Sequence, residues 1–337
     1  MNKDARVVVI GGGTGTFATL SALKGRVGHL SAIVNMVDDG GSTGVLRDEL
    51  GVLPPGDVRQ CLVALASDTS HMRKLMNYRF EDGTFEGHPF GNLFLSVLEK
   101  TTGGFADAVK TAGEILAIEG EVIPVTTDDI RLCRRQPDGT VIRGEGTIQD
   151  SFFERGENAD IYLEPQAVLN EEAARAIREA DLIVFGPGNF YCSLVPNLLV
   201  EGMPTALKTA DGKRVFICNL VNKPHQTAGF KVHDYVERLE RHAEPGLFDY
   251  VLYDSSRPSE ELLARYREAG EEWVEHDPAA FEGKPYRAIG TDLLSTAPPQ
   301  RRGSGPRQAA VTRNLIRHDP EKLAAVILRE LLPGSGA

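Results

Sequence analysis

The 337-residue sequence predicts a doubly wound α/β fold, in which helices cover both faces of a mostly parallel sheet. Two observations support this prediction. Short apolar runs rich in β-branched residues alternate with stretches of helical periodicity, a pattern typical of parallel strands that are buried on both faces. Several of these runs also end directly in glycine-rich loops, as strands do in nucleotide-binding sheets.

The elements follow one another in a regular order along the chain. The expected strands are the apolar runs 6–10, 32–37, 122–125, 182–185, 214–220 and 250–253, and the expected helices include 105–118, 171–180, 232–242 and 260–268. Three helix starts carry capping signals, because Asn170, Ser259 and Asp319 can each accept a hydrogen bond from the free N–H groups of the first turn. Pro320, directly after Asp319, suits the first helical position.

One region departs from this alternation. Residues 130–135 and 140–143 are predicted to form two strands joined by an Asp-Gly turn, an antiparallel hairpin inserted at about residues 130–150. The hairpin could serve as a sheet edge, a lid or a dimer arm. A Pro-, Gly- and Arg-rich loop at about 298–308 and a tail at 333–337 are expected to be flexible, the first as a solvated loop. Residues 1–332, which include the hairpin and this loop, are expected to form a single domain.

Composition excludes several classes of partner. The 48 acidic and 37 basic residues give a formal charge of −11, which opposes sequence-independent binding to nucleic acid or to an anionic membrane. No apolar stretch approaches the roughly 18 residues of a membrane span, and the charged first six residues do not resemble a signal peptide. We therefore expect a cytoplasmic protein. Cys61, Cys133, Cys192 and Cys218 lack zinc-site spacing and are expected to be reduced and mostly buried.

Residues suited to binding lie where the predicted strands end. The first strand ends in the sequence GGGTG at residues 11–15, and a helix follows, so the backbone can approach a phosphate and offer it N–H groups. Gly13, Gly15 and Ala18 fit the dinucleotide fingerprint, and Asp38-Asp39 follow the next strand, where a ribose-binding carboxylate would lie. A tight turn without a ligand is the alternative.

A second glycine-rich loop follows the acidic pair. Two adjacent carboxylates beside two such loops suit a site that orients sugar hydroxyls, or one that holds Mg²⁺ through Asp38, Asp39 and phosphate oxygens. Arg47 and Arg59 could contact phosphate, with a surface ion pair as the alternative for each. Ligands of open α/β sheets bind outside the carboxyl ends of the strands, so these loops are expected to converge on one crevice.

These motifs carry a resemblance to a known family. They are, in order, VIGGGTG (9–15), VDDGGS (37–42), PPGDVRQCL (54–62), GHPFGNL (87–93), GPG (186–188) and CNL (218–220). In this order they resemble the YvcK family of gluconeogenesis factors, relatives of the CofD phospholactate transferases, from about Val7 to Leu331. The resemblance implies a CofD-like Rossmann-type fold. It also implies a cytoplasmic regulatory protein that binds a UDP-sugar, chiefly UDP-N-acetylglucosamine, and controls cell shape and envelope precursors during growth on gluconeogenic carbon sources.

The same resemblance implies which residues line the site. Tyr266 would stack on the ligand or donate its hydroxyl, with a packed tyrosine as the alternative, and Arg317 would contact a phosphate. The complete ligand-binding set implied is Gly11, Gly12, Gly13, Thr14, Gly15, Asp38, Asp39, Gly41, Ser42, Gly56, Asp57, Arg59, His88, Asn92, Gly188, Asn189, Tyr266 and Arg317.

The resemblance implies binding rather than a demonstrated reaction, and no cofactor is required apart from Mg²⁺ that could accompany a phosphate-bearing ligand. The alternative is a CofD-like, Mg²⁺-dependent transferase of the 2-phospho-L-lactate type, in which His88 positions a hydroxyl and Arg59 or Arg317 stabilises charge on the transferred group. A nicotinamide oxidoreductase is a more distant alternative, because a double Asp before Gly-Gly-Ser is not what hydride transfer needs. A homodimer and a regulatory protein partner of unknown identity are also expected.

Overall fold

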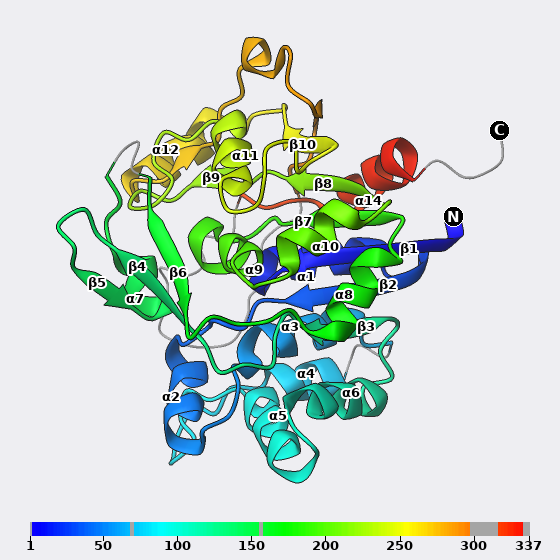
Figure 1. The fold of residues 1–337 in the computed structure, drawn as a ribbon, viewed down its shortest axis with the longest axis vertical. Helices are drawn as coiled ribbons and strands as arrows, with labels where there is room; N and C mark the ends of the chain where they lie inside the picture. The colour runs from blue at the N-terminus through cyan, green and yellow to red at the C-terminus, as the bar shows by residue number, and fades with distance from the viewer. Residues whose placement is uncertain (1, 68–70, 155–157, 297–315, 333–337) are drawn as a thin grey trace.

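The computed structural model describes residues 2–67, 71–154, 158–296 and 316–332. Within these residues the chain folds as an α/β protein with a seven-stranded parallel sheet and a smaller antiparallel sheet, which confirms the predicted fold class (Figure 1). The loop predicted at 298–308 and the tail at 333–337 lie outside the described residues.

The parallel sheet contains all six strands that the sequence predicts outside the hairpin. Its order is β12-β10-β8-β7-β1-β2-β3. The second strand begins five residues earlier than expected, and β12 was not predicted because its sequence, RAIGT, lacks a continuous apolar run. The strands are β1 (Asn2–Gly11), β2 (Val27–Val34), β3 (Glu121–Pro124), β7 (Leu182–Phe185), β8 (Lys213–Ile217), β10 (Tyr250–Asp254) and β12 (Arg287–Thr291).

The order of the strands creates a switch point at the centre of the sheet. From β1 the chain moves outward to β2 and β3, and it then returns to place β7 on the other side of β1. The register sets Ile10 of β1 beside Ile33 of β2 and Phe185 of β7. In doubly wound sheets, ligands bind outside the carboxyl ends of the strands at such a switch point.

The helices form layers on the two faces of the sheet. Helices α1, α3 and α14 pack together on one face, whereas α8, α9 and α10 pack together on the other (Figure 1). The helices are α1 (Gly13–Leu23), α2 (Gly41–Leu50), α3 (Pro55–Leu65), α4 (His71–Asn77), α5 (Phe90–Thr101), α6 (Phe105–Ile115), α7 (Glu145–Asp150), α8 (Glu171–Arg178), α9 (Val195–Leu198), α10 (Met203–Thr209), α11 (Val232–Glu240), α12 (Glu260–Glu268) and α14 (Pro320–Val326), with short π or 3-10 turns η1 (Phe190–Leu194), η2 (Pro278–Phe281) and η3 (Ile327–Leu331).

The three predicted helix caps are confirmed. Asn170 Oδ1 accepts a hydrogen bond from the Glu172 N–H at 2.9 Å, and Asp319 Oδ1 accepts one from the Glu321 N–H at 2.9 Å. Ser259 Oγ caps α12 in the same way, at a longer distance of 3.4 Å. Short polar side chains therefore fix these helix starts locally, as the sequence indicates.

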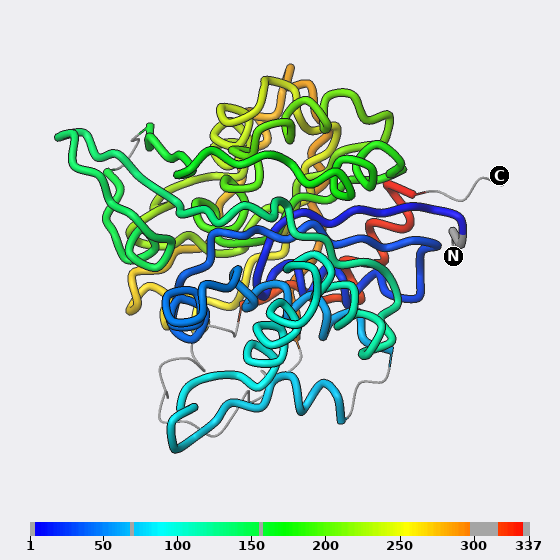
Figure 2. Tube along the Cα trace, turned by 60° about the horizontal axis from the view of Figure 1, so that its bottom comes forward, coloured from blue at the N-terminus to red at the C-terminus, as the bar shows by residue number. Residues whose placement is uncertain are grey.

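The predicted hairpin is present and belongs to a larger unit. Strands β4 (Arg131–Arg135) and β5 (Val141–Arg143) pair antiparallel, and a third strand, β6 (Asp160–Glu164), extends the sheet in the order β5-β4-β6. This inserted sheet projects on the side of the molecule away from both termini in Figures 1 and 2. A further two-stranded sheet joins β9 (Val221–Asn222) to β11 (Glu272–Trp273).

The core lies on both faces of the parallel sheet. The strand residues Val9, Ile10 and Val184 are fully buried, as continuous apolar strands covered by helices must be. All four cysteines are free thiols and are buried, which confirms the prediction from their spacing. In the described residues we find no helix with the length and apolar character of a membrane span.

Candidate functional site

Two glycine-rich loops meet at the switch point between β1 and β7. The first, residues 11–15, joins β1 to α1, and the second, residues 186–188, follows β7. A methyl group at Gly15 would overlap the carbonyl oxygen of Pro187, so only glycine permits this contact between the two backbones. Thr19 Oγ1, 3.4 Å from the Gly186 carbonyl oxygen, adds a hydrogen bond between them. The first glycine loop is therefore held against the second.

Asp57, in the first turn of α3, covers the first glycine loop. A methyl group at Gly12 would overlap Asp57 Oδ2, and one at Gly13 would lie 3.5 Å from Asp57 Oδ1. The carboxyl of Asp57 accepts a hydrogen bond from the Gly13 backbone. Burial raises the pKa of Asp57 well above its usual value, and the nearby charges of Asp38 and Glu145 raise it further. The Asp57 carboxyl therefore lies over the glycine-loop backbone that the sequence predicts to bind phosphate.

The adjacent residues Asp38 and Asp39 point to different helix starts. Asp38 Oδ1 accepts from the Gly40 N–H at 3.0 Å, and burial raises the pKa of Asp38. Asp39 accepts from the N–H groups of Glu145 and Gly146 at 3.0 and 2.8 Å, and so it caps α7. Asp39 therefore ties the inserted sheet to the end of β2, a role that its position after a strand does not reveal.

These contacts bear on the predicted Mg²⁺ site. The described ranges contain no group of three acidic, His or Cys side chains placed to hold a metal ion. Both carboxylate oxygens of Asp39 accept hydrogen bonds from the start of α7. Asp38 lies close enough to Asp57 for its charge to raise the pKa of Asp57. The side chains fit Mg²⁺ only in part: Asp38 would supply one oxygen ligand, and a phosphate-bearing ligand would have to supply others.

Glu145, at the start of α7, belongs to the same acidic group, although sequence reasoning missed it. Burial raises the pKa of Glu145 to about 7, and the charges of Asp38 and Asp39 contribute, whereas Lys223 opposes the shift. Glu145 follows the inserted hairpin and lies 106 residues beyond Asp39, whose carboxylate accepts its N–H. The preceding Gly144, with φ of 98°, is the only local signal of a special turn.

A chain of polar side chains extends from this acidic group into the helical layer. Arg59 Nε donates to Asn92 Oδ1 at 2.8 Å, and Asn92 Nδ2 donates to Ser42 Oγ at 3.2 Å. Ser42 Oγ lies 2.9 Å from His88 Nδ1. A second guanidinium nitrogen of Arg59 donates to Asn77, a residue that sequence reasoning did not single out. Three separate motifs of the sequence are thereby brought into one hydrogen-bonded chain.

The second glycine loop carries further predicted residues. Asn219, at the end of β8, donates to the Gly188 carbonyl oxygen at 2.8 Å. Asn189 Nδ2 donates to Gln149 Oε1 at 3.0 Å, while Asn189 Oδ1 is buried without a hydrogen-bond partner in the described part of the chain. Of the remaining candidates, Thr14 is exposed at the start of α1, Gly41 begins α2 with φ of 46°, and Gly56 packs against Asp38.

The structure places Tyr266 in a packed position. Its side chain is 4% exposed and lies in a small apolar cluster with Leu220, Leu263 and Ile316. The Tyr266 hydroxyl accepts a hydrogen bond from the Ile316 N–H at 2.8 Å. This is the packed arrangement that the sequence left open, and through it Tyr266 positions the segment that carries Arg317. Direct contact of either side chain with a ligand stays a prediction.

Arg47 occupies a position that neither of its predicted roles describes. Its side chain is 1% exposed, and it donates to the carbonyl oxygens of Asp38 and Ile130 at 3.0 and 2.6 Å. It also pairs with Asp129 at 2.5 Å. The expectation of a phosphate contact or a surface ion pair with a neighbour is wrong, because these donors connect the end of β2 to the inserted sheet.

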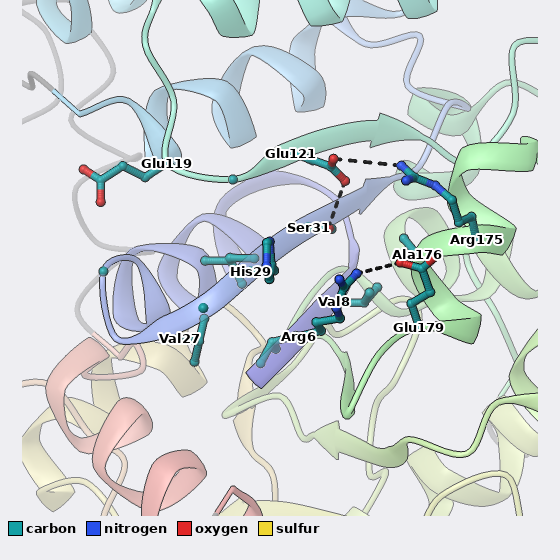
Figure 3. Close-up of a pocket in the computed structure, with 15 residues that line it drawn as sticks. Arg6, Val8, Val27, His29, Ser31, Glu119, Glu121, Arg175, Ala176 and Glu179 are labelled. Carbon is teal, nitrogen blue, oxygen red and sulfur yellow. Dashed lines mark hydrogen bonds and ion pairs between the residues drawn. The ribbon is translucent and has the colours of Figure 1, made fainter. Parts of the chain in front are cut away.

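A cavity of about 410 Å³ lies at the opposite, amino end of the sheet (Figure 3). Its two arginines each pair with an acidic residue, Arg6 with Glu179 at 2.6 Å and Arg175 with Glu121 at 3.9 Å. It contains none of the predicted ligand-binding residues. This cavity therefore lies at the other end of the sheet from the acidic side chains with raised pKa values. We place the candidate site at the carboxyl end, because perturbed pKa values cluster at functional sites.

Comparison with known proteins gives consistent results. The family described as 2-phospho-L-lactate transferase CofD matches residues 7–294. The chain is 39% identical over 329 residues to a Thermotoga maritima protein named "Putative gluconeogenesis factor", with 96% of this chain and 98% of that protein covered. It is 33% identical over 332 residues to the gluconeogenesis factor of Bacillus subtilis, with coverage of 97% and 98%. The crystal structure of a UPF0052 family member from Bacillus halodurans superposes with a TM-score of 0.86, at 33% identity and coverage of 96% and 99%.

Proposed function

This chain belongs to the CofD family, with gluconeogenesis factors among its relatives, and we propose that it is a cytoplasmic regulatory protein that binds a UDP-sugar, chiefly UDP-N-acetylglucosamine. The observation that carries the proposal is the meeting of two glycine loops at the β1/β7 switch point, directly before the N-terminus of α1. Accessible N–H groups at a helix N-terminus bind phosphate groups, such as those of a nucleoside diphosphate.

The polar groups around these loops support a sugar nucleotide. Thr14 is exposed and Gly13 and Gly15 are partly exposed at the start of α1, so their backbone can be reached by a phosphate. The carboxyls of Asp38 and Glu145 are hydrogen-bond acceptors suited to sugar hydroxyls. The anionic ligand would have to displace the Asp57 carboxyl from the Gly13 N–H, or bind beside it.

The inserted sheet offers a route from ligand binding to regulation. It is attached to the site through Asp39, which caps α7, and through Arg47, which reaches the carbonyl oxygen of Ile130. A ligand that favours one position of the residue 38–39 segment would shift the position of the inserted sheet. A protein partner, or a second copy of the chain, could recognise that shift and connect sugar-nucleotide supply to cell shape and envelope synthesis on gluconeogenic carbon sources.

Isothermal titration calorimetry tests the proposal. UDP-N-acetylglucosamine, UDP-glucose, NAD and GDP are titrated separately, with and without Mg²⁺. We expect micromolar, Mg²⁺-independent binding of the UDP-sugars and weaker binding of NAD and GDP. Equal binding of all four compounds, or none, would contradict a UDP-sugar site.

A second candidate is a CofD-like phospho-group transferase, favoured by the family match itself. In that case Asp38 would hold Mg²⁺ together with phosphate oxygens, and Arg59 would stabilise charge on the transferred group. Incubation with a nucleotide-linked donor, a hydroxyl acceptor and Mg²⁺ distinguishes the two candidates. Formation of a phosphodiester product that depends on the acceptor would replace the regulatory proposal with the transferase.

A further inference from the structure

The polar chain from Arg59 through Asn92 to Ser42 has a fixed hydrogen-bond direction. Arginine can only donate, so the group of Asn92 that faces Arg59 Nε at 2.8 Å must be the acceptor, Oδ1. The other end of the Asn92 amide, Nδ2, can only donate, and it faces Ser42 Oγ at 3.2 Å. Ser42 Oγ therefore accepts a hydrogen bond from Asn92, and the Ser42 O–H can donate to another group.

That partner is the ring of His88. Ser42 Oγ lies 2.9 Å from His88 Nδ1, and within the described residues no other acceptor is placed on the Ser42 hydroxyl. When Ser42 donates, Nδ1 of the neutral imidazole must accept, and the ring proton then lies on Nε2. No described residue makes a hydrogen bond to His88 Nε2, and the side chain is partly exposed.

We propose that His88 presents Nε2–H as a hydrogen-bond donor to an oxygen atom of the ligand, and that Asn92 and Ser42 are positioning residues that fix this tautomer. The ligand role of His88 rests on the UDP-sugar function proposed above. Asn92 is 2% exposed, and both ends of its amide are used within the protein, so it acts through its neighbours. These side chains come from three helices and a loop, which lie together only in the folded chain: Ser42, Arg59, Asn92 and His88.

Long-range ¹H–¹⁵N correlation NMR of the histidine rings tests the tautomer at pH 8 in the full-length protein. The wild type is expected to show His88 with a protonated Nε2 and an unprotonated Nδ1. Ser42→Ala removes the donor, and Asn92→Asp diverts the Ser42 proton to a carboxylate, so both variants should lose the tautomer preference. Ser42→Thr keeps a hydroxyl and should retain it.

Ser96→Ala is the matched control, because Ser96 is a buried serine on α5, the helix that carries Asn92, and its described hydrogen bond goes to the Asn92 carbonyl oxygen. It should leave the His88 spectrum unchanged. A wild-type proton on Nδ1, or an unchanged spectrum in both Ser42→Ala and Asn92→Asp, overturns the proposal.

Calorimetry with UDP-N-acetylglucosamine tests the ligand contact separately. Ser42→Ala should lower the affinity about fivefold to tenfold, and Ser42→Thr should restore it. Unchanged affinity in Ser42→Ala, despite loss of the tautomer, would remove His88 as a ligand contact. If the wild type itself binds no UDP-sugar, the proposed function fails, while the NMR result still decides the tautomer.

Discussion

The two ends of the parallel sheet differ in how they arrange charge. At the amino end, both arginines around the cavity of Figure 3 form pairs of opposite sign, and the side chains of the Arg6–Glu179 pair are about half exposed. At the carboxyl end, the partly buried Asp38, Asp57 and Glu145 bring like charges together, and desolvation raises the pKa of each.

This difference favours the carboxyl end as the candidate site. Exposed pairs of opposite charge contribute little to stability and need no special surroundings. Like charges that are shielded from water destabilise the fold, and side chains with pKa values perturbed in this way cluster at functional sites. The amino end has a described cavity of about 410 Å³, yet both of its arginines are already paired with glutamates. The following predictions test whether the carboxyl end is the strained and functional one.

The largest effect is expected from Gly15→Ala. Its methyl group would overlap the Pro187 carbonyl oxygen, and a backbone atom cannot move aside as a flexible side chain can. Unfolding in urea should show a loss of about 3 kcal/mol or more. Gly146→Ala is the control, because a methyl group there lies 3.4 Å from Asp39 Oδ1 and should cost less than about 1 kcal/mol. Equal stability of the two variants would show that the glycine loops are not closely packed.

Arg317→Ala should weaken UDP-N-acetylglucosamine binding by about 1.5–3 kcal/mol, the range for a charge-assisted hydrogen bond. Calorimetry measures this loss as a rise in Kd of roughly tenfold or more. Arg175→Ala, at the amino end of the sheet, should leave the affinity unchanged. Comparable losses in both variants would indicate a general effect of net charge and remove Arg317 from the site.

Glu145→Gln should stabilise the protein at pH 8 but not at pH 4.5. The pKa of Glu145 is raised from 4.5 to about 7 in the folded state. Between these values the unfolded chain loses the proton while the folded protein keeps it, so wild-type stability falls as pH rises from about 4.5 to 7. Glutamine removes this loss, which is on the order of 3 kcal/mol at pH 8.

Urea unfolding at the two pH values measures the gain. Glu121→Gln, which alters the exposed pair with Arg175 at the amino end, serves as control and should change stability by less than about 0.5 kcal/mol at either pH. A gain from Glu145→Gln that is the same at pH 4.5 and pH 8 would show that ionisation of Glu145 is not its cause.

The smallest effect is expected from Glu179→Gln. This change breaks the 2.6 Å pair with Arg6, whose side chains are 49% and 43% exposed. Solvent screening limits such a pair to about 0–1 kcal/mol, and thermal unfolding should shift by no more than a few degrees. A loss above about 2 kcal/mol would mean that the amino end also depends on its charges.

Much of the fold could be predicted from local sequence patterns. The run LIVF at 182–185 predicts a buried strand because four consecutive apolar residues suit a sheet covered on both faces. Asn170 predicts the start of α8 because its side chain can reach an N–H two residues later. The Asp138-Gly139 turn predicts the hairpin for the same kind of reason, since Asp138 accepts from the Thr140 N–H and Gly139 has φ of 87°.

The site was predicted less completely. The glycine loops could be identified, because their backbone conformation depends on residues next to one another in the chain. Glu145 could not, since its partner Asp39 lies 106 residues away, and the role of Arg47 depends on Asp129, 82 residues away. A side chain's partners across such distances depend on strand order and helix packing, which local propensities do not specify.

The sequence by itself therefore determined the class of fold, the glycine loops at the strand ends, the helix caps and the membership of a known family. The tertiary structure decided which carboxylates gather at the switch point, which aspartate caps α7, and how His88 is linked to Arg59. The physical reason is the range of the interactions. Backbone conformation depends mainly on neighbouring residues, whereas the electrostatics of a site depends on side chains that only the folded chain brings within a few ångströms of one another.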